Sequence, residues 1–112
     1  GETDMFWLGW FADYPDPENF LFPLFHSANL GPAGNRARYK NPKVDSLIEA
    51  GQHAYTMKER DMYYERAENM IVADAAWVFF WHKTDYTVRQ PWVKNYQTYL
   101  IYSIDKGTEI GF

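Results

Sequence analysis

Residues 5–19 read MFWLGWFADYPDPEN, and this stretch predicts a buried strand that runs directly into a stiff loop. Residues 5–12 are apolar and rich in aromatic side chains, a pattern typical of a strand buried on both faces. Pro15 and Pro17 then stand at alternating positions, and prolines spaced in this way favour an extended loop. We therefore expect a strand to end immediately before Asp13.

The first predicted helix begins at Asn41 and Pro42, because asparagine is a favoured N-cap and proline is favoured in the first turn. Before this helix, a short helical turn packed on the core is expected over residues 20–28. After Pro42, apolar or small residues recur with the spacing of one buried helix face. They are Val44, Leu47, Ile48 and Gly51.

The second predicted helix begins at Thr56, where the run TMKE fits a capping box, and it should end near residues 74–76. Arg60 is expected on its outer face, whereas its buried stripe comprises Tyr63, Ala67, Met70 and Ile71. Further strands are predicted over residues 77–81, 86–88 and 96–104. This order of elements predicts an α/β unit, a mixed sheet with two main helices.

The composition excludes several classes of protein. The 112 residues fit one domain with a core of its own, and the absence of cysteine removes disulfides, thiolate metal sites and cysteine nucleophiles. A net charge of −4 argues against a nucleic-acid partner. Aromatic residues make up 20% of the chain although its mean hydropathy is −0.54. This surplus indicates a ligand cleft or a surface that faces a partner.

Asp13 is the candidate binding residue that the sequence singles out. It follows an aromatic strand and is held by the loop prolines, and ligand sites in α/β folds form at the ends of strands. Trp10 and Phe11 stand beside it, so its carboxylate suits a cation, ideally an amine, with an indole available for cation–π contact. The alternative is a carboxylate that only caps neighbouring backbone N–H groups.

Other interpretations of the charged residues are weaker. A calcium site in the acidic loop does not match an EF-hand spacing, and a glycosidase pair needs carboxylates about 5–9.5 Å apart. The acids in question are Asp13, Asp16 and Glu18. The basic stretch 36–43 is expected to be a solvated surface that weakly attracts this loop. No histidine or serine motif predicts a metal site or a nucleophile. We therefore expect neither an enzyme nor a cofactor.

Several motifs together resemble the extracellular solute-binding proteins of family 5, the oligopeptide- and dipeptide-binding receptors of ABC importers. Residues 9–20, GWFADYPDPENF, match the family pattern G-W-x-A-D-Y-x-D-P-x-x-F. Further motifs match in the same order over residues 35–45, 60–74, 77–82 and 88–96. The resemblance spans nearly the whole chain.

The resemblance implies that the chain, residues 1–112, is the C-terminal part of a bilobal, periplasmic-binding-protein-like (type II) receptor. Residues 1–76 would complete the second lobe, and residues 77–112 would return toward the first lobe. In peptide-binding members, the aspartate of the motif pairs with the α-ammonium group of the ligand, and Asp13 holds that position here. Trp10 would line the cleft, and Phe11 would contribute mainly through its backbone.

The implied function is binding of di- or oligopeptides and their delivery to the membrane permease of an ABC importer. The implied location is periplasmic or extracellular, with or without a lipid anchor. Members that bind nickel or sugars leave the ligand open. A hydrolase domain built on Asp13, Asp16 and Glu18, or an interaction module that uses the aromatic surface, are the alternatives. The isolated chain is expected to bind peptides weakly and to self-associate.

Overall fold

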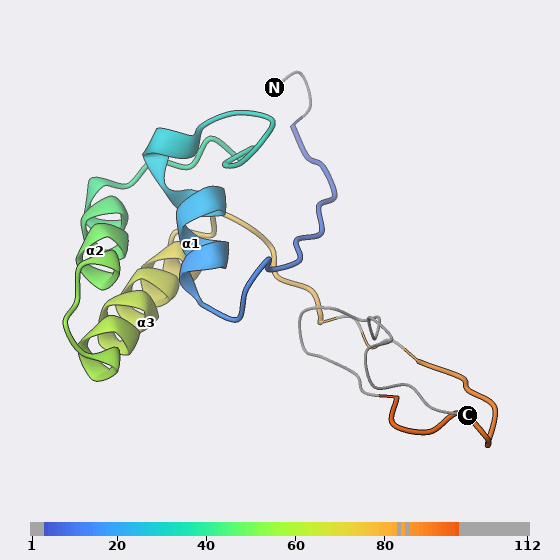
Figure 1. Ribbon diagram of the computed structural model, residues 1–112. Coiled ribbons are helices and arrows are strands. Elements are labelled where there is room, and N and C mark those ends of the chain that lie inside the picture. Colours follow the sequence, from blue (N-terminus) through green and yellow to red (C-terminus); the bar gives the residue numbers. More distant parts are fainter. Residues whose placement is uncertain (1–3, 83, 85, 97–112) are drawn as a thin grey trace. The chain divides into compact units, whose positions relative to one another are not determined.

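A computed structural model of the chain describes residues 4–82, 84 and 86–96. The chain divides into two units, Gly1–Phe79 and Phe80–Phe112. The helices of the described residues lie in the first unit (Figure 1). Helix α1 spans Glu18–Phe25, the 3₁₀ helix η1 spans Ser27–Asn29, α2 spans Pro42–Gln52 and α3 spans Met57–Ala73.

Both longer helices begin where the sequence predicts. The side chain of Asn41 accepts a hydrogen bond from the backbone N–H of Lys43 at 3.1 Å, and Pro42 is the first residue of α2. At the start of α3, the hydroxyl of Thr56 accepts from the backbone N–H of Glu59 at 3.2 Å. Each cap satisfies an N–H group that the first turn of a helix leaves without a partner.

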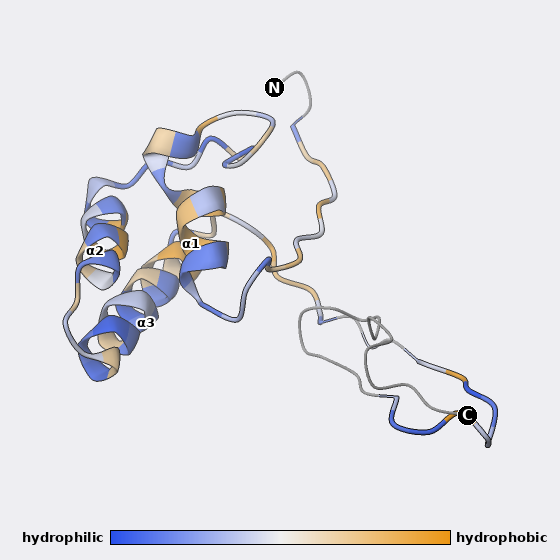
Figure 2. Ribbon diagram, in the orientation of Figure 1, coloured by the Kyte–Doolittle hydropathy of each residue, from blue (hydrophilic) through white to orange (hydrophobic). Residues whose placement is uncertain are grey.

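Helices α2 and α3 form a hairpin, and α1 packs against both of them (Figure 1). Figure 2 shows apolar and polar residues interspersed along α2 and α3, as is typical of helices with one buried face. A methyl group on Gly51 would lie 2.4 Å from Cε1 of Tyr64, so glycine lets the two helices approach closely. The core comprises Leu21, Leu24, Phe25, Val44, Ile48, Tyr64, Ala67 and Ile71.

The buried stripe of α3 differs from the predicted one at its N-terminal end. Tyr64 is buried, whereas Tyr63, which was expected in the stripe, is only half-buried. Arg60 is also half-buried and does not lie on a fully solvated outer face. Arg60 and Tyr64 are one helical turn apart and therefore lie on the same side of α3. Both differences mean that α3 is rotated slightly about its axis relative to the predicted orientation.

The predicted mixed sheet is not confirmed. The described part of residues 5–12, 77–81 and 86–88 contains no strand, and most of the predicted strand 96–104 lies outside the described residues. An isolated bridge pairs Leu30 with Asn35. A strand needs a neighbouring strand for its backbone hydrogen bonds, and apolar sequence alone does not supply one. The described first unit is therefore helical.

The connection between η1 and α2 is organised by Asn35, which is completely buried. Its amide Nδ2 donates to the carbonyls of His26 at 3.3 Å and Tyr39 at 2.7 Å, and its Oδ1 accepts from the N–H of Tyr39 at 3.0 Å. Further along, Tyr39 and Asn41 both donate to Oδ2 of Asp74, just after α3, at 2.5 and 2.7 Å. These bonds tie the loop to the end of α3.

The pKa values of this cluster follow from its contacts. Burial, together with the hydrogen bond to Asp74, raises the pKa of Tyr39 to about 12. The same hydrogen bond, together with that from Asn41, lowers the pKa of Asp74. The matched motif residues Asn35, Tyr39 and Asn41 thus have structural roles.

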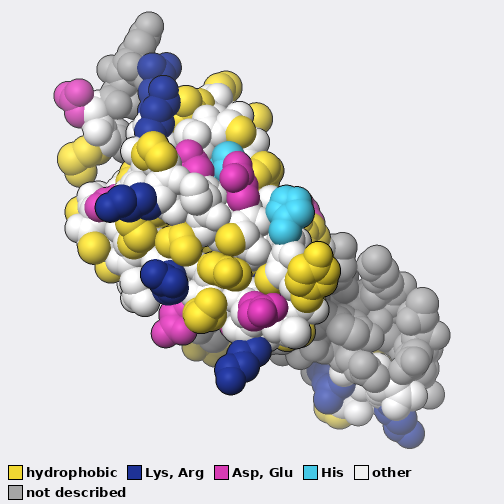
Figure 3. Space-filling view, turned by 90° about the vertical axis from the view of Figure 1, so that its left-hand side faces the viewer, with side chains coloured by type: hydrophobic (Ala, Val, Ile, Leu, Met, Phe, Trp, Pro, Cys, Tyr) yellow, Lys and Arg dark blue, Asp and Glu magenta, His cyan; other side chains and the backbone are white. Residues whose placement is uncertain are grey.

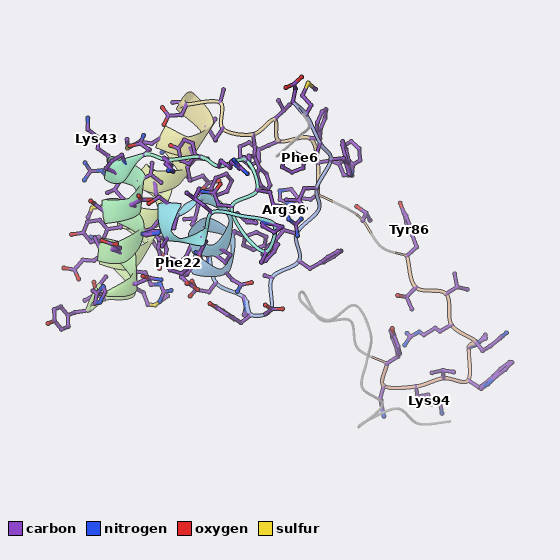
Figure 4. All side chains as sticks on the ribbon, turned by 90° about the horizontal axis from the view of Figure 1, so that it is seen from above. Phe6, Phe22, Arg36, Lys43, Tyr86 and Lys94 are labelled. Atoms are coloured by element: carbon purple, nitrogen blue, oxygen red, sulfur yellow. The ribbon has the colours of Figure 1, made fainter. Side chains whose placement is uncertain are left out.

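Charged side chains of both signs are dispersed among apolar ones on the face shown in Figure 3. Lys43, at the start of α2, points away from the helices (Figure 4) and belongs to the basic stretch 36–43.

Among the described helices, none is long and apolar enough to cross a membrane. In the second unit, the N–H of Val93 closes a turn onto the carbonyl of Gln90 at 3.1 Å.

Candidate functional site

The loop that carries Asp13 is held in shape by its own hydrogen bonds. The backbone N–H of Asp16 donates to the carbonyl of Tyr14 at 2.9 Å. Oδ1 of Asp16 accepts from the N–H of Glu18 at 2.8 Å and so caps the first turn of α1. Pro17 cannot provide such a cap with its own side chain. The acidic loop therefore leads directly into α1 with little freedom.

Arg60 attaches this loop to α3. Its Nη2 lies 2.7 Å from Oδ1 of Asp16, and the two side chains are only 25% and 22% exposed. The same nitrogen is 3.3 Å from the hydroxyl of Tyr64, and the guanidinium lies 5.1 Å from the centre of the Tyr64 ring. Asp16 thus shares one oxygen between the start of α1 and a cation on α3.

Asn19 holds two of the three predicted binding residues. Its side-chain Oδ1 accepts from the backbone N–H of Asp13 at 2.8 Å. Its backbone carbonyl accepts from the indole Nε1–H of Trp10, also at 2.8 Å. Asn19 itself is only 6% exposed. The backbone of Asp13 and the ring of Trp10 are therefore fixed to the same buried residue.

The predicted site residues differ in their surroundings. Trp10 is half-buried and packs against the core of the helical unit. Asp13 is exposed, and among the described residues its carboxylate takes part in no hydrogen bond or ion pair. Phe11 is 70% exposed. The structure thus brings Trp10 and Asp13 together through Asn19, and it leaves the Phe11 side chain pointing into solvent.

The other two acids of the loop are already engaged. Asp16 binds Arg60 and the N–H of Glu18, as described above. Glu18 accepts from the hydroxyl of Tyr14 with one oxygen and from Nε2 of Gln52 with the other, at 3.1 Å. Within the described part of the chain, no group of three or more acids, histidines or cysteines could hold a metal ion. This arrangement favours neither a calcium site nor a carboxylate pair for hydrolysis.

The histidines have local structural contacts. His26 is buried, and its Nδ1 accepts from the N–H of Ala28 at 3.1 Å, which caps η1. Its Nε2 lies 3.3 Å from Oε1 of Glu49 on α2. Nδ1 of His53 lies 2.8 Å from the carbonyl of Glu49. The interpretation of His26 and His53 as ordinary core or surface histidines therefore fits their contacts.

Sequence reasoning missed Arg60 and Asn19. Arg60 is 44 positions from Asp16, and only their opposite charges could have suggested the pair. Asn19 falls on a position that the motif pattern leaves unspecified, so the motif assigned it no role. An open depression of about 400 Å³ lies elsewhere, lined by Phe22, Pro23 and residues 29–34, and includes none of the predicted site residues.

Comparison with curated proteins places this arrangement in context. A "Probable di/tripeptide-binding protein 5" of Pseudomonas aeruginosa (strain UCBPP-PA14) is 36% identical over 97 residues, which are 87% of this chain and 18% of that protein. The chain is a relative of the family 5 solute-binding proteins. The resemblance of the motifs is thereby confirmed.

Two further relatives are named for other ligands. "Heme-binding protein A" of Haemophilus influenzae is 33% identical over 86% of this chain and 17% of its own length. "Periplasmic oligopeptide-binding protein OppA" of Escherichia coli (strain K12) is 29% identical over 86% of this chain and 17% of its own length. The chain spans less than a fifth of the length of each of these three relatives. No family model and no solved structure matches the chain.

Proposed function

We propose that this chain is part of a substrate-binding protein of an ABC importer and that it binds the amino terminus of short peptides. The observation that carries the proposal is the contrast within the acidic loop. Asp16 and Glu18 are used by the fold, whereas Asp13 has a fixed backbone and a carboxylate without a hydrogen bond or ion pair among the described residues. The names of several relatives, which bind di-, tri- or oligopeptides, support the same ligand class.

The proposed roles follow from chemistry. A carboxylate is the natural partner of an α-ammonium group, and a charge-assisted hydrogen bond is stronger than a neutral one. The indole of Trp10, fixed at its Nε1 end, would offer its ring to the first residues of the peptide. Phe11 would act mainly through its backbone, as the resemblance to the family implies.

The fold of the whole protein is also a proposal. We infer a bilobal type II receptor with a mixed sheet, in which residues 1–76 complete the second lobe and residues 77–112 return toward the first. The apolar segments 5–12 and 77–81 would find their strand partners in other parts of that receptor. The chain spans less than a fifth of the length of these relatives, which supports its being one part of a larger receptor.

Lobe closure would then be the mechanism. A peptide that contacts both lobes only in the closed state shifts the population toward that state, which a membrane permease can recognise. Several relatives are named as periplasmic proteins, which supports a location in the periplasm or outside the cell. No catalytic step is needed, since the relatives are named as binding proteins and not as enzymes.

Self-association of the isolated chain is a second part of the proposal. Large apolar side chains are exposed on the two apolar segments of the helical unit, among them Phe6, Phe11, Val78 and Phe79. Phe6 lies on the extended N-terminal segment (Figure 4). Contiguous apolar surface is rarely left open on a soluble monomer. Light scattering at high concentration should give a mass above 13.3 kDa, and a stable monomer would contradict this part.

The experiment that tests the proposed function is calorimetry on the protein as its gene encodes it. The probes are a library of tripeptides with free amino termini, the same tripeptides after N-acetylation, and hemin, the ligand class named for one relative. We expect micromolar or tighter binding of free tripeptides and strongly reduced binding of acetylated ones. Binding of hemin alone, or equal binding of both peptide sets, would contradict the proposal.

A further inference from the structure

Helix α1 contains a proline that changes the bonding of one carbonyl. In an α-helix the N–H of residue 23 would donate to the carbonyl of residue 19, but Pro23 has no N–H. The carbonyl of Asn19 therefore lacks its ordinary helical donor. The indole N–H of Trp10 donates to this carbonyl at 2.8 Å. Pro23 thus leaves open the acceptor that fixes Trp10.

The side chain of Asn19 acts on the other binding residue. Its Oδ1 accepts from the N–H of Asp13 at 2.8 Å, and the residue is 6% exposed, so water competes little for this bond. One residue thereby orients the indole with its backbone and the Asp13 backbone with its side chain. Among the described residues, the Asp13 carboxylate has no hydrogen bond or ion pair of its own, so this backbone bond is what fixes the point from which the carboxylate projects.

We propose that Asn19 is a positioning residue for the ligand amine, and that Pro23 is its structural complement. This inference rests on the proposed function, in which Asp13 binds the ammonium group. Asn19 does not touch the ligand. It fixes in advance the geometry in which Asp13 and Trp10 receive the ligand, and preorganisation of this kind reduces the entropy lost on binding.

Asn19→Leu tests the side-chain bond, because leucine has a similar size and no acceptor. In the full protein as its gene encodes it, affinity for the tightest free-amine tripeptide should fall about three- to tenfold, the effect of one hydrogen bond. The backbone amide of Asp13 should exchange its hydrogen faster. In an Asp13→Asn background, the same substitution should change affinity by less than about twofold, since the charge that it positions is gone.

Asn29→Leu is the matched control. The side chain of Asn29 also holds a backbone group, donating to the carbonyl of Phe22 at 2.8 Å. Because its side chain is not hydrogen-bonded to either binding residue, we expect Asn29→Leu to leave tripeptide affinity and Asp13 amide exchange unchanged. A similar affinity loss in both variants would mean that α1 acts only through general stability, and it would overturn the proposal.

Pro23→Ala provides a variant that favours helix formation and restores an N–H to compete for the Asn19 carbonyl. The indole N–H of Trp10 should then exchange faster, and tripeptide affinity should fall. Unchanged exchange at Trp10 in this variant and at Asp13 in Asn19→Leu would overturn the inference. If Asp13→Asn weakens binding and Asn19→Leu does not, the inference fails and the proposed function stands. If Asp13→Asn leaves binding unchanged, both fail.

Discussion

Arg60 and Asp16 join α3 to the acidic loop across 44 positions of sequence, with 2.7 Å between guanidinium Nη2 and carboxylate Oδ1. The same carboxylate oxygen caps α1, so two hydrogen bonds to one oxygen link the loop, α1 and α3. The basic stretch 36–43 was expected to attract this loop. Among the described residues, the cation that pairs with Asp16 is Arg60 instead.

Replacing Arg60 should therefore loosen the loop as well as the helices. We expect Arg60→Gln to lower the free energy of unfolding by about 1–2 kcal/mol, between the values for exposed and for buried ion pairs. Urea unfolding followed by circular dichroism measures the change. Arg66→Gln, at an exposed position of the same helix, is the control and should change stability by less than about 0.5 kcal/mol. Equal effects of the two substitutions would contradict the role of the Asp16 pair.

The Tyr39–Asp74 bond predicts how stability depends on pH. Because the folded pKa of Asp74 is lowered, its contribution is present above the unfolded pKa near 3.8 and is lost as the pH falls through the folded pKa. Because the folded pKa of Tyr39 is raised to about 12, its contribution is present below pH 10 and is lost as the pH rises from 10 toward 12.

Tyr39→Phe checks both signs. Carboxyl ¹³C NMR titration should show the pKa of Asp74 moving up toward its ordinary value, although the bond from Asn41 retains part of the shift. The loss of stability between pH 10 and 12 should also become smaller. An unchanged Asp74 titration in Tyr39→Phe would mean that the tyrosine hydroxyl does not hold this carboxylate.

Gly51→Ala tests the close packing of α2 on α3. The added methyl would lie 2.4 Å from Cε1 of Tyr64, so the ring or the helices must move. Overpacking of this kind destabilises by about 1–3 kcal/mol, and the better helix propensity of alanine offsets less than about 1 kcal/mol of it. Gly9→Ala, where nothing lies within 4 Å, is the control for thermal unfolding. A stabilised Gly51→Ala variant would contradict this packing.

The isolated 112-residue chain should bind peptides poorly. Ligand pockets enclose about 70–90% of a ligand, whereas the Asp13 carboxylate is exposed. Calorimetry with the free-amine tripeptide library should give dissociation constants in the millimolar range or no binding. Micromolar binding by this chain alone would contradict the proposal that a second lobe completes the site.

Local signals in the sequence were sufficient for the starts of the two longer helices, whereas α1 spans Glu18–Phe25 where a short helical turn over residues 20–28 was expected. Asn41 with Pro42 and the Thr56 capping signal act within one turn, so both helix starts could be predicted from neighbouring residues. Tyr63 and Tyr64 could not be told apart by periodicity. The choice depends on Gly51, which makes room for the Tyr64 ring from another helix. The strand predictions required pairing partners, and apolar runs carry no information about those partners.

The candidate site was predicted only in part. Asp13 and Trp10 were singled out because they stand at the end of an aromatic run. The residue that joins them, Asn19, acts through a side-chain oxygen and a backbone carbonyl, and the carbonyl is open because of Pro23. A relation among four residues of this kind depends on the three-dimensional course of the loop. It therefore has no signature in composition or spacing.

The central claim is that Asp13 holds the ligand amine, and a double cycle on the full protein tests it most directly. Wild type and Asp13→Asn are each titrated with a free tripeptide and with its N-acetylated form. Each single change should weaken binding by about 2–5 kcal/mol, roughly 30- to 3000-fold, because it leaves one charge unpaired in a closed cleft. The second change should then add little, since both delete the same interaction. Losses that simply add would contradict the claim and leave Asp13 as an ordinary loop carboxylate.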